Sequence, residues 1–370
     1  MNKTKIPVNE PYLGQREKEL VNECLESGWI SSAGKYIEKF ENQFAEYCEC
    51  AEGVTTTSGT TAIHLALKSL GVGPGDEVLV PAFTMVGSVY PIVQCGASPV
   101  FVDSEPDTGN MDIQDLESKI TASTKVILIV HIYGHPADMD PICDLARSRN
   151  LKILEDAAEA HGALYKGRKA GSLGDVGCFS FYANKIITTG EGGMIVSNDK
   201  DLIKKARQLK DLAHGKIRFT HELPEAFNYR MTNIQAAIGL GQLERIEETV
   251  KKKIANAEQY SNLLKGVSCL KLPVCRPWAR NVYWMYGVQL LDNDRFARDE
   301  LMTALKNEGV DTRSFFYPLN TQKAFQGYGK QDCPKAEILG KQGFYLPSGQ
   351  TLKPNQIQRV AEILVELLQA

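Results

Sequence analysis

One lysine, Lys185, lies inside the apolar and β-prone run CFSFYANKIITTGEGGMIV at residues 178–196, directly before a glycine-rich turn. Lysine is among the side chains that are buried least often, and burial lowers its pKa towards the range in which the neutral amine is a nucleophile. A solvated lysine at a strand end would explain the same pattern. The run therefore indicates either an exposed strand end or an enclosed reactive amine.

Two further stretches could bind parts of a ligand. Ser58, Gly59 and Thr60 immediately precede a helical pattern in TTTSGTTAIHLALKSL, where free N–H groups, the helix dipole and hydroxyls can hold a phosphate. The apolar run LKILEDAAEAHG passes through Asp156, at the edge where open α/β sheets bind their ligands. Each stretch could also be a simple helix cap.

Taken together, the three stretches predict a pyridoxal 5′-phosphate (PLP) site. Ser58 through Thr60 would hold the phosphate, and Asp156 would pair with the protonated ring nitrogen. The aldehyde of the cofactor would form a Schiff base with Lys185. Ser180, on the strand before Lys185, can add a hydroxyl to the phosphate. The shared order of phosphate loop, carboxylate and lysine favours this interpretation over three unrelated features.

These residues need a sheet that brings distant strand ends together. The short apolar runs EVLVPA, SPVFVD, KVILIVHIYG and LKILEDA alternate with helix-like segments, which predicts an α/β fold with a parallel sheet covered on both faces. CFSFYA and GMIVSN are predicted to be two strands linked by the glycine-rich turn. A helical zone follows, and the remainder mixes strands and helices. We expect a large domain over 1–245 and a smaller α+β domain over 246–370.

The composition excludes several classes of protein. The 370 residues are 43% hydrophobic and 24% charged with a net charge of -3, as in ordinary globular proteins, and this balance offers no basic field for nucleic acid. No apolar run is long enough to span a membrane, and the first residues lack the apolar core of a signal peptide, so a cytoplasmic protein is expected. The nine scattered cysteines lack the spacing of a zinc site, and His131 and His135 lack the third ligand that a metal site would need.

The chain resembles the DegT/DnrJ/EryC1/StrS sugar aminotransferases, a family of PLP-dependent enzymes of fold type I, the aspartate aminotransferase fold. The motifs that carry the resemblance are GWISSAGKYIEKFENQFAEY, SGTTAIHLAL, GPGDEVLVPAFT, PVFVD, HIYGHPADMDPI, LEDAAEAHGA, FSFYANKIITTGEGGMI, FNYRMTNIQAAIGLGQL and FYPLNTQ. The resemblance implies a mostly parallel seven-stranded sheet in the large domain. It also implies that Lys185 and Asp156 are the catalytic pair, with Lys185 moving the proton as general acid and base.

The resemblance assigns a set of residues to the cofactor. They are Ser58, Gly59, Thr60, Met85, Asp156, Glu159, Ser180, Lys185 and Asn228. Asn228 is implied to reach the phosphate of the neighbouring subunit, so a homodimer with shared sites is expected. Met85 replaces the aromatic ring that many members stack on the cofactor. Glu159 replaces a common glutamine, and its carboxylate would need a proton or a cationic neighbour beside the phenolic oxygen of the cofactor.

The motifs also suggest the reaction. They are most similar to members that move the amino group of L-glutamate to C4 of GDP-4-keto-6-deoxy-D-mannose, giving GDP-perosamine. UDP- or dTDP-linked 4-keto-6-deoxy sugars are the alternative substrates, and a non-catalytic PLP-binding regulator is the alternative class. Candidate substrate contacts are Trp29, Ser31, His161, Arg230, Arg313, Tyr317 and Pro318. Core aromatic residues and solvated arginines would explain most of these positions equally well.

Overall fold

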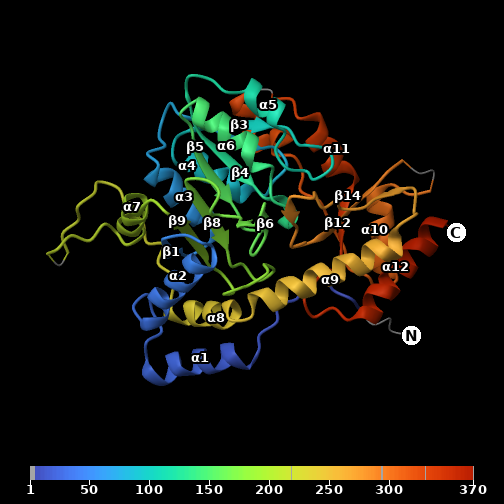
Figure 1. The fold of residues 1–370 in the computed structure, drawn as a ribbon, viewed down its shortest axis with the longest axis horizontal. Coiled ribbons are helices and arrows are strands. Elements are labelled where there is room, and N and C mark those ends of the chain that lie inside the picture. The colour runs from blue at the N-terminus through green and yellow to red at the C-terminus, as the bar shows by residue number, and fades with distance from the viewer. Residues whose placement is uncertain (1–4, 218, 293–294, 330, 370) are drawn as a thin grey trace.

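A layered α/β body and a smaller, strand-and-helix part make up the chain (Figure 1). The computed structural model describes residues 5–217, 219–292, 295–329 and 331–369. The long helix α9 (Ile246–Leu264) runs from the α/β body into the second part. We propose that the two domains divide where α8 (Asn233–Leu243) gives way to α9.

The main sheet has seven strands, of which all but β9 run in the same direction. In spatial order they are β1 (Glu52–Thr56), β9 (Gly193–Ser197), β8 (Val176–Ser180), β5 (Lys152–Asp156), β4 (Thr124–Val130), β2 (Glu77–Pro81) and β3 (Ser98–Val102). The predicted α/β fold with a mostly parallel sheet is confirmed, and so is the predicted pair of strands around the glycine-rich turn. The carboxyl ends of the six aligned strands meet at one edge, where a ligand site is expected.

Alternate residues of β2, β3, β4 and β5 supply two different cores. In β4, Val126, Leu128 and Val130 pack on the side of α3 and α4, whereas Ile127 and Ile129 pack with α5 and α6. This period-2 pattern is what a sheet with helices on both faces requires. The covering helices are α2 (Lys35–Tyr47), α3 (Gly59–Ser69), α4 (Tyr90–Gln94), α5 (Ile113–Ser118), α6 (Met139–Ser148) and α7 (Lys200–Lys210).

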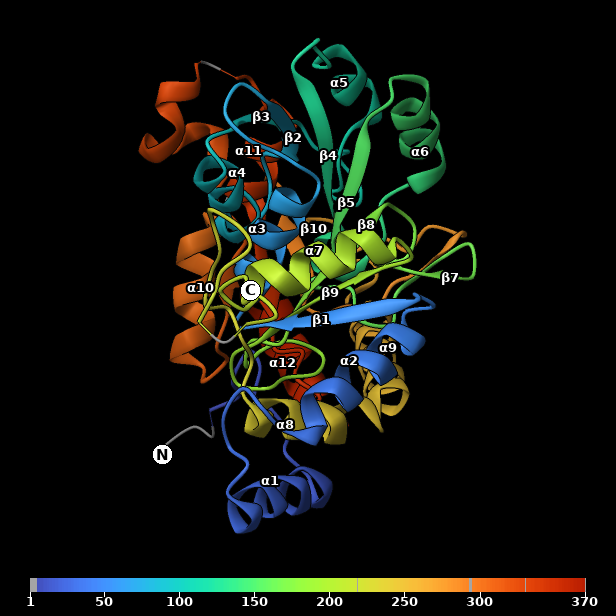
Figure 2. The same cartoon turned by 90° about the vertical axis from the view of Figure 1, so that its left-hand side faces the viewer.

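Helix α8 packs between α1 (Gln15–Ser27) and α2, as Figure 2 shows below the sheet. Its N-terminus is capped by Thr232, whose hydroxyl accepts the N–H of Gln235, while the Gln235 side chain reaches back to the Thr232 N–H. The cap determines where the preceding loop 228–232 meets the body.

The second part is built on an antiparallel sheet in the order β10-β12-β14-β13. Its core is formed by apolar residues of α9, α10 and α12, among them Tyr260, Leu305 and Leu364. The remaining elements are β10 (Leu270–Lys271), β12 (Tyr286–Leu290), α10 (Arg298–Asn307), β13 (Arg313–Ser314), α11 (Pro334–Gln342), β14 (Gly343–Leu346) and α12 (Pro354–Gln369). A small third sheet joins β6 (Leu164–Tyr165), β7 (Arg168–Lys169) and β11 (Ala279–Arg280).

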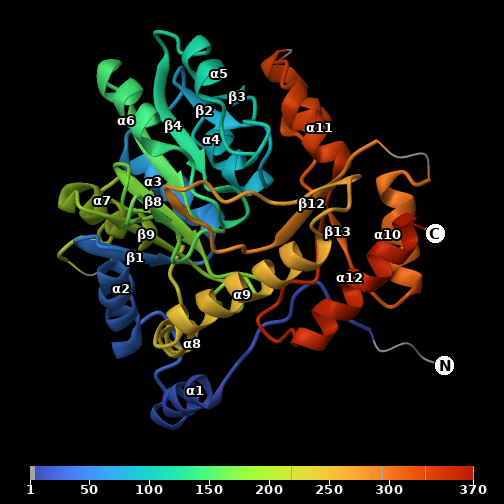
Figure 3. The ribbon, with the colours of Figure 1, turned by 45° about the vertical axis from the view of Figure 1, so that its right-hand side comes forward.

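The N-terminal segment crosses between the two parts. Ile6 pairs with Val310 and is buried in the core of the C-terminal part, although it lies at the start of the chain. Ser348 donates its N–H to the carbonyl of Val8, one residue before Asn9 enters the pocket described below. Figure 3 shows this blue segment passing beside α12.

Over the residues that the structure describes, every helix is too short or too polar to serve as a transmembrane segment.

Candidate active site

A pocket of about 1090 Å³ opens at the carboxyl edge of the main sheet. The α/β body contributes the turns after β1, β2, β5 and β8. The C-terminal part contributes residues 284–285, 311, 313–317, 319, 322 and 345. A cavity of this size at a domain boundary is typical of a binding site for a cofactor and a large substrate.

The start of α3 forms one end of the pocket. Ser58 is the N-cap, and its hydroxyl accepts the N–H of Thr61 while the Thr61 hydroxyl accepts the N–H of Ser58. Gly59 lies so close to Ser180 that a Cβ on it would fall 2.7 Å from the Ser180 Cβ. The first N–H groups of a helix have no intrahelical partner, so this end can bind an anion such as a phosphate. Ser58, Gly59, Thr60 and Ser180 all line the pocket, as predicted.

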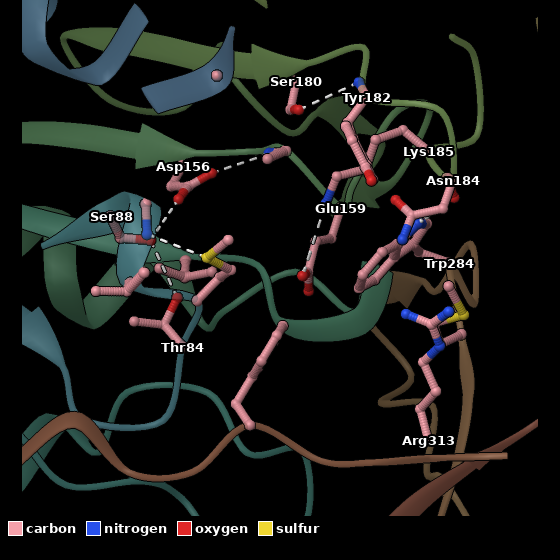
Figure 4. A pocket seen from close by; sticks show the side chains of 18 of the residues that line it. Thr84, Ser88, Asp156, Glu159, Ser180, Tyr182, Asn184, Lys185, Trp284 and Arg313 are labelled. Carbon is pink, nitrogen blue, oxygen red and sulfur yellow. Dashed lines mark hydrogen bonds and ion pairs between the residues drawn. The ribbon is translucent and has the colours of Figure 1, made fainter. Parts of the chain in front are cut away.

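Asp156 ends β5 and is 6% exposed. Its carboxylate accepts a hydrogen bond from the Ser88 hydroxyl at 2.7 Å and one from the Ala158 N–H at 3.1 Å (Figure 4). Burial raises the pKa of Asp156, and these hydrogen bonds oppose the rise. A buried carboxylate of this kind gains most from a cationic partner, such as a protonated ring nitrogen. The preceding Glu155 points to the other face of the sheet, where the N–H groups of residues 171, 173 and 174 bind it.

Lys185 is enclosed rather than solvated. Its side chain is 11% exposed, and its Nζ lies 3.8 Å from Oε1 of Glu159. The same Nζ lies over the Trp284 ring, 3.9 Å from the ring centroid. Burial lowers the pKa of the Lys185 amine, while the carboxylates of Glu159 and Asp156 favour the charged form. Of the two interpretations of this lysine, the solvated strand end is therefore wrong.

Glu159 is the second buried carboxyl group of the pocket. It is 3% exposed and accepts the N–H of Tyr133 at 2.8 Å. Burial raises the pKa of Glu159 to about 7, and the Lys185 amine opposes the rise. The sequence predicted that Glu159 would need a proton or a cationic neighbour. The structure provides the Lys185 amine as the neighbour, and the raised pKa of Glu159 allows it to hold a proton near pH 7. Tyr133 has a left-handed backbone with φ of 53°, uncommon for a non-glycine residue, which aims its N–H at this carboxylate.

Four more predicted residues lie in different places relative to the pocket. Met85 lines the pocket and is 54% exposed, and Arg313 and Tyr317 line it from the C-terminal part. Pro318 lies outside the lining residues and packs against Gly340.

Four predicted residues gather elsewhere, around the start of α8. Asn233 donates its N–H to the carbonyl of Ser31 and its side-chain amide to the carbonyl of Trp29. Arg230 donates to the side-chain oxygen of Asn228 at 2.9 Å. Trp29, Ser31, Asn228 and Arg230 are absent from the lining of the pocket in their own chain. Trp29 is 59% exposed beside a separate pocket of about 370 Å³ between α1 and α2.

The expectation for His161 is wrong. The side chain is fully buried beneath the site, with ring centroids 5.2 Å from Phe179, 5.7 Å from Phe181 and 6.3 Å from Phe44. Burial lowers its pKa to about 3, so the ring is neutral. A histidine enclosed by three phenylalanines supports the pocket floor and does not meet a substrate.

Ser88 and Trp284 are among the pocket residues that the sequence reasoning missed. Ser88 follows β2 in a stretch rich in small residues. The Thr84 hydroxyl, four residues earlier, lies 3.1 Å from that of Ser88, and these two hydroxyl residues after a strand were a weak indication of a polar site. Trp284 comes from the C-terminal part, and nothing in its local sequence indicates that it faces Lys185.

A family model, the DegT/DnrJ/EryC1/StrS aminotransferase family, matches residues 11–365. The chain belongs to this family. It is therefore a PLP-dependent aminotransferase, and it has the fold type I architecture that the motifs implied.

Relatives of this DegT-family chain are similar over their full length. The GDP-perosamine synthase of Caulobacter vibrioides is 43% identical over 98% of both chains. That of Escherichia coli O157:H7 is 45% identical over 98% of both, and that of Vibrio cholerae is 41% identical over 97% of this chain and 98% of its own.

Solved structures agree with the fold of this family member. DesV of S. venezuelae, in complex with a ketimine intermediate, superposes with a TM-score of 0.92 at 34% identity over 99% of both chains. The PLP form of Spr1654 from Streptococcus pneumoniae superposes with a TM-score of 0.93 at 28% identity over 99% of this chain and 100% of its own.

The residues present in this aminotransferase fit PLP. The helix start at Ser58 and the bare Gly59 leave a cradle that a single Cβ would begin to fill. The Asp156 carboxylate is buried and held by two neutral donors, which suits a cationic ring nitrogen. Lys185 offers its amine to the same pocket.

Proposed function

We propose that this enzyme transfers the amino group of L-glutamate to C4 of GDP-4-keto-6-deoxy-D-mannose, producing GDP-perosamine. The observation that carries the proposal is the enclosed Lys185 amine, which shares one pocket with the Asp156 carboxylate and the start of α3. The choice of sugar and nucleotide is supported by three relatives, named GDP-perosamine synthases, that are 41–45% identical over 97–98% of this chain.

The cofactor would be held at three points. Ser58, Gly59, Thr60 and Ser180 would bind its phosphate, and Met85 would cover one face of its ring with a polarizable thioether. Asp156 would keep the ring nitrogen protonated, an ion pair that the Ser88 hydroxyl helps to orient. When bound, PLP supplies the electron sink that lets an amino group pass between an amino acid and a keto sugar.

Lys185 would move the proton of the reaction. Burial lowers the pKa of its amine, which makes the neutral, proton-accepting form more accessible than for a solvated lysine. Glu159 lies 3.8 Å away and can hold a proton near neutral pH. Both side chains are largely buried, with Lys185 11% and Glu159 4% exposed, so a proton can be held by either group without solvation by bulk water.

The nucleotide sugar would enter from the side of the C-terminal part. The Arg313 guanidinium and the Tyr317 ring line that side of the pocket, and Tyr317 is 57% exposed. A guanidinium suits a diphosphate, and an aromatic face suits a sugar or a base.

We also propose a homodimer with shared active sites. Trp29, Ser31, Asn228 and Arg230 lie together around the start of α8 and outside the pocket of their own chain. Residues that contribute to the active site of a second subunit are expected at the surface, outside the pocket of their own chain. In this arrangement Asn228 binds the cofactor phosphate of the partner, and the other three residues contact its substrate.

A substrate panel tests the proposed reaction. The purified enzyme is incubated with PLP, L-glutamate and one of the GDP-, UDP- or dTDP-linked 4-keto-6-deoxy sugars, and the amino sugar is quantified by mass spectrometry. We expect product with the GDP-linked mannose derivative. Product only with a uridine or thymidine sugar would overturn the nucleotide assignment, and a failure of glutamate to change the visible absorbance of the bound cofactor would favour a regulator.

A further inference from the structure

Trp284 faces the reactive amine from the C-terminal part of the chain. The Nζ of Lys185 lies 3.9 Å from the centroid of its ring, and the indole is 4% exposed. The electron-rich face of an indole attracts an ammonium group, and the attraction is stronger where water is excluded. The Trp284 ring and the Glu159 carboxylate thus both lie close to the same amine (Figure 4).

The polar edge of the same ring holds the backbone beside the lysine. The Nε1–H of Trp284 donates to the carbonyl of Asn184 at 2.8 Å, and the side-chain amide of Asn9 donates to the same oxygen at 2.7 Å. The Lys185 N–H in turn donates to the carbonyl of Tyr182 at 2.9 Å. Three distant segments therefore meet at the peptide that precedes Lys185.

The segment that carries Trp284 is itself anchored to the α/β body. Val282 donates its N–H to the carbonyl of Gly134 at 3.1 Å, and within the segment Tyr283 donates its N–H to the side chain of Asn281 at 2.9 Å. Gly134 has φ of +97°, and a Cβ on it would lie 2.7 Å from Val282 Cγ2 and 3.0 Å from the Trp284 nitrogen. The contact leaves no room for a side chain, so the two segments have a fixed separation.

We propose that Trp284 is a positioning residue for Lys185: its ring directs the amine into the pocket, and its indole N–H, together with Asn9, immobilises the peptide before the lysine. The proposal rests on the proposed role of Lys185. The other groups close to the Lys185 amine, Glu159 and Asp156, belong to the α/β body. The proposal explains why an aromatic residue of the C-terminal part also reaches this amine. A lysine on a restrained stem loses less freedom when its amine must meet a reacting atom.

The charge of the amine depends on every group around it. Glu159 and Asp156 face it with carboxylates, Arg313 lines the same pocket with a guanidinium, and His161 lies below it as a neutral ring. The Trp284 ring favours the ammonium form, so its removal should lower the pKa of Lys185 while these other groups remain.

The first experiment measures the amine directly in the full chain without cofactor. Lys185 is acetylated with trace acetic anhydride over a range of pH, and the labelled peptide is quantified by mass spectrometry. In Trp284→Leu the midpoint of the labelling curve should fall by about one pH unit, and in Trp284→Phe it should fall less because a weaker aromatic face remains. Trp278→Phe is the matched control, since this indole packs on Tyr165 and His135 away from the pocket.

The second experiment separates positioning from folding. Trp284→Phe and Asn9→Ala each remove one donor to the Asn184 carbonyl, and each should lower kcat at least threefold with KM for the sugar nucleotide nearly unchanged. Unshifted labelling in Trp284→Leu, or a kcat for both donor variants equal to that of Trp278→Phe, would overturn the proposal. Lys185→Ala separates the proposed catalytic role of Lys185 from the proposed positioning role of Trp284. Turnover in Lys185→Ala would refute the catalytic role of the lysine itself.

Discussion

At the scale of single residues, the site depends on the balance of two buried carboxyl groups and one amine. Asp156 is held by the hydroxyl of Ser88, whereas Glu159 lies beside Lys185 and receives an N–H from Tyr133. Two negative charges near one positive charge are unfavourable away from water, so a proton is expected on one carboxyl group before the cofactor binds. Glu159, with a pKa raised to about 7, is the group that takes it.

This balance predicts a pH-dependent stability. The folded chain binds a proton on Glu159 up to about pH 7, whereas the unfolded chain loses it near 4.5, so the free energy of unfolding falls as pH rises between these values. In Glu159→Gln this decrease should be absent. Urea unfolding of the cofactor-free chain at pH 5, 6, 7 and 8 should show the variant gaining stability relative to the wild type. Glu117→Gln, an exposed change in α5, should follow the wild type, and parallel curves for both variants would contradict the prediction.

At the scale of elements, the start of α3 and the end of β8 form one cradle. Gly59 at the helix start and Ser180 at the strand end are in contact because neither offers a larger side chain to the space between them. Gly59→Ala would place a Cβ 2.7 Å from the Ser180 Cβ, and overpacking of this kind costs about 1–3 kcal/mol.

We expect Gly59→Ala to weaken the binding of PLP about tenfold or more, because the displaced Ser180 and helix start no longer match the phosphate. The dissociation constant can be measured by titrating the cofactor-free chain and following the visible absorbance. Gly73→Ala is the control, since a Cβ there meets nothing within 4 Å. Equal affinities for the two variants would show that the phosphate does not bind at this helix.

Helix α9 carries a buried amine, Lys253, that has no part in the proposed reaction. Lys253 is 4% exposed and donates to the carbonyl of Ser348 at 2.7 Å, in the loop after β14. Burial lowers its pKa from 10.5 to about 7. The unfolded chain therefore binds more protons between these values, and the contribution of Lys253 to stability increases as pH rises through this window.

Lys253→Met should remove that pH dependence. From pH 7 to pH 9, the unfolding free energy of the wild type should increase relative to that of the variant, by up to about 1.4 kcal/mol per pH unit. Denaturant unfolding at three pH values measures it. Lys251→Met, an exposed change on the same helix, provides the baseline, and a constant difference for Lys253→Met would mean that the amine is charged when folded.

At the scale of the whole molecule, the pocket combines segments from both parts of one chain and, in the proposed homodimer, from a second chain. Asn9, Asp156, Lys185 and Trp284 come from four regions of the sequence and line one cavity. Asn228 lies outside that cavity, on the surface around the start of α8.

Mixing two inactive variants tests the shared site. A Lys185→Ala subunit retains Asn228, and an Asn228→Ala subunit retains Lys185, so a mixed dimer has one complete site. With random pairing after co-expression, activity should return to about a quarter of the wild-type value. Turnover of the purified mixture is compared with that of each variant alone. Activity equal to the average of the two separate variants would contradict a site that spans the subunits.

The local sequence by itself determined the fold class and the centre of the site. Short continuous apolar runs that alternate with helix-like segments predict a parallel sheet, because its strands are buried on both faces. Asp156 lies at the end of such a strand, and Lys185 lies directly before a glycine-rich turn. The start of α3 was also identifiable, because hydroxyl residues before a helix are typical of a cap or an anion site, and the order of the three stretches favoured the anion site. Such features depend on neighbours within a few residues, so they can be inferred from the sequence.

Only the tertiary structure decided which distant side chains meet these groups. His161 was expected in the substrate cleft but is enclosed by phenylalanines of α2 and the β8 segment, and Trp284 was overlooked but lies over the amine. The physical reason is that packing between different elements of the fold depends on shape and burial across the whole core. The type of a single residue does not indicate which distant side chains will pack against it.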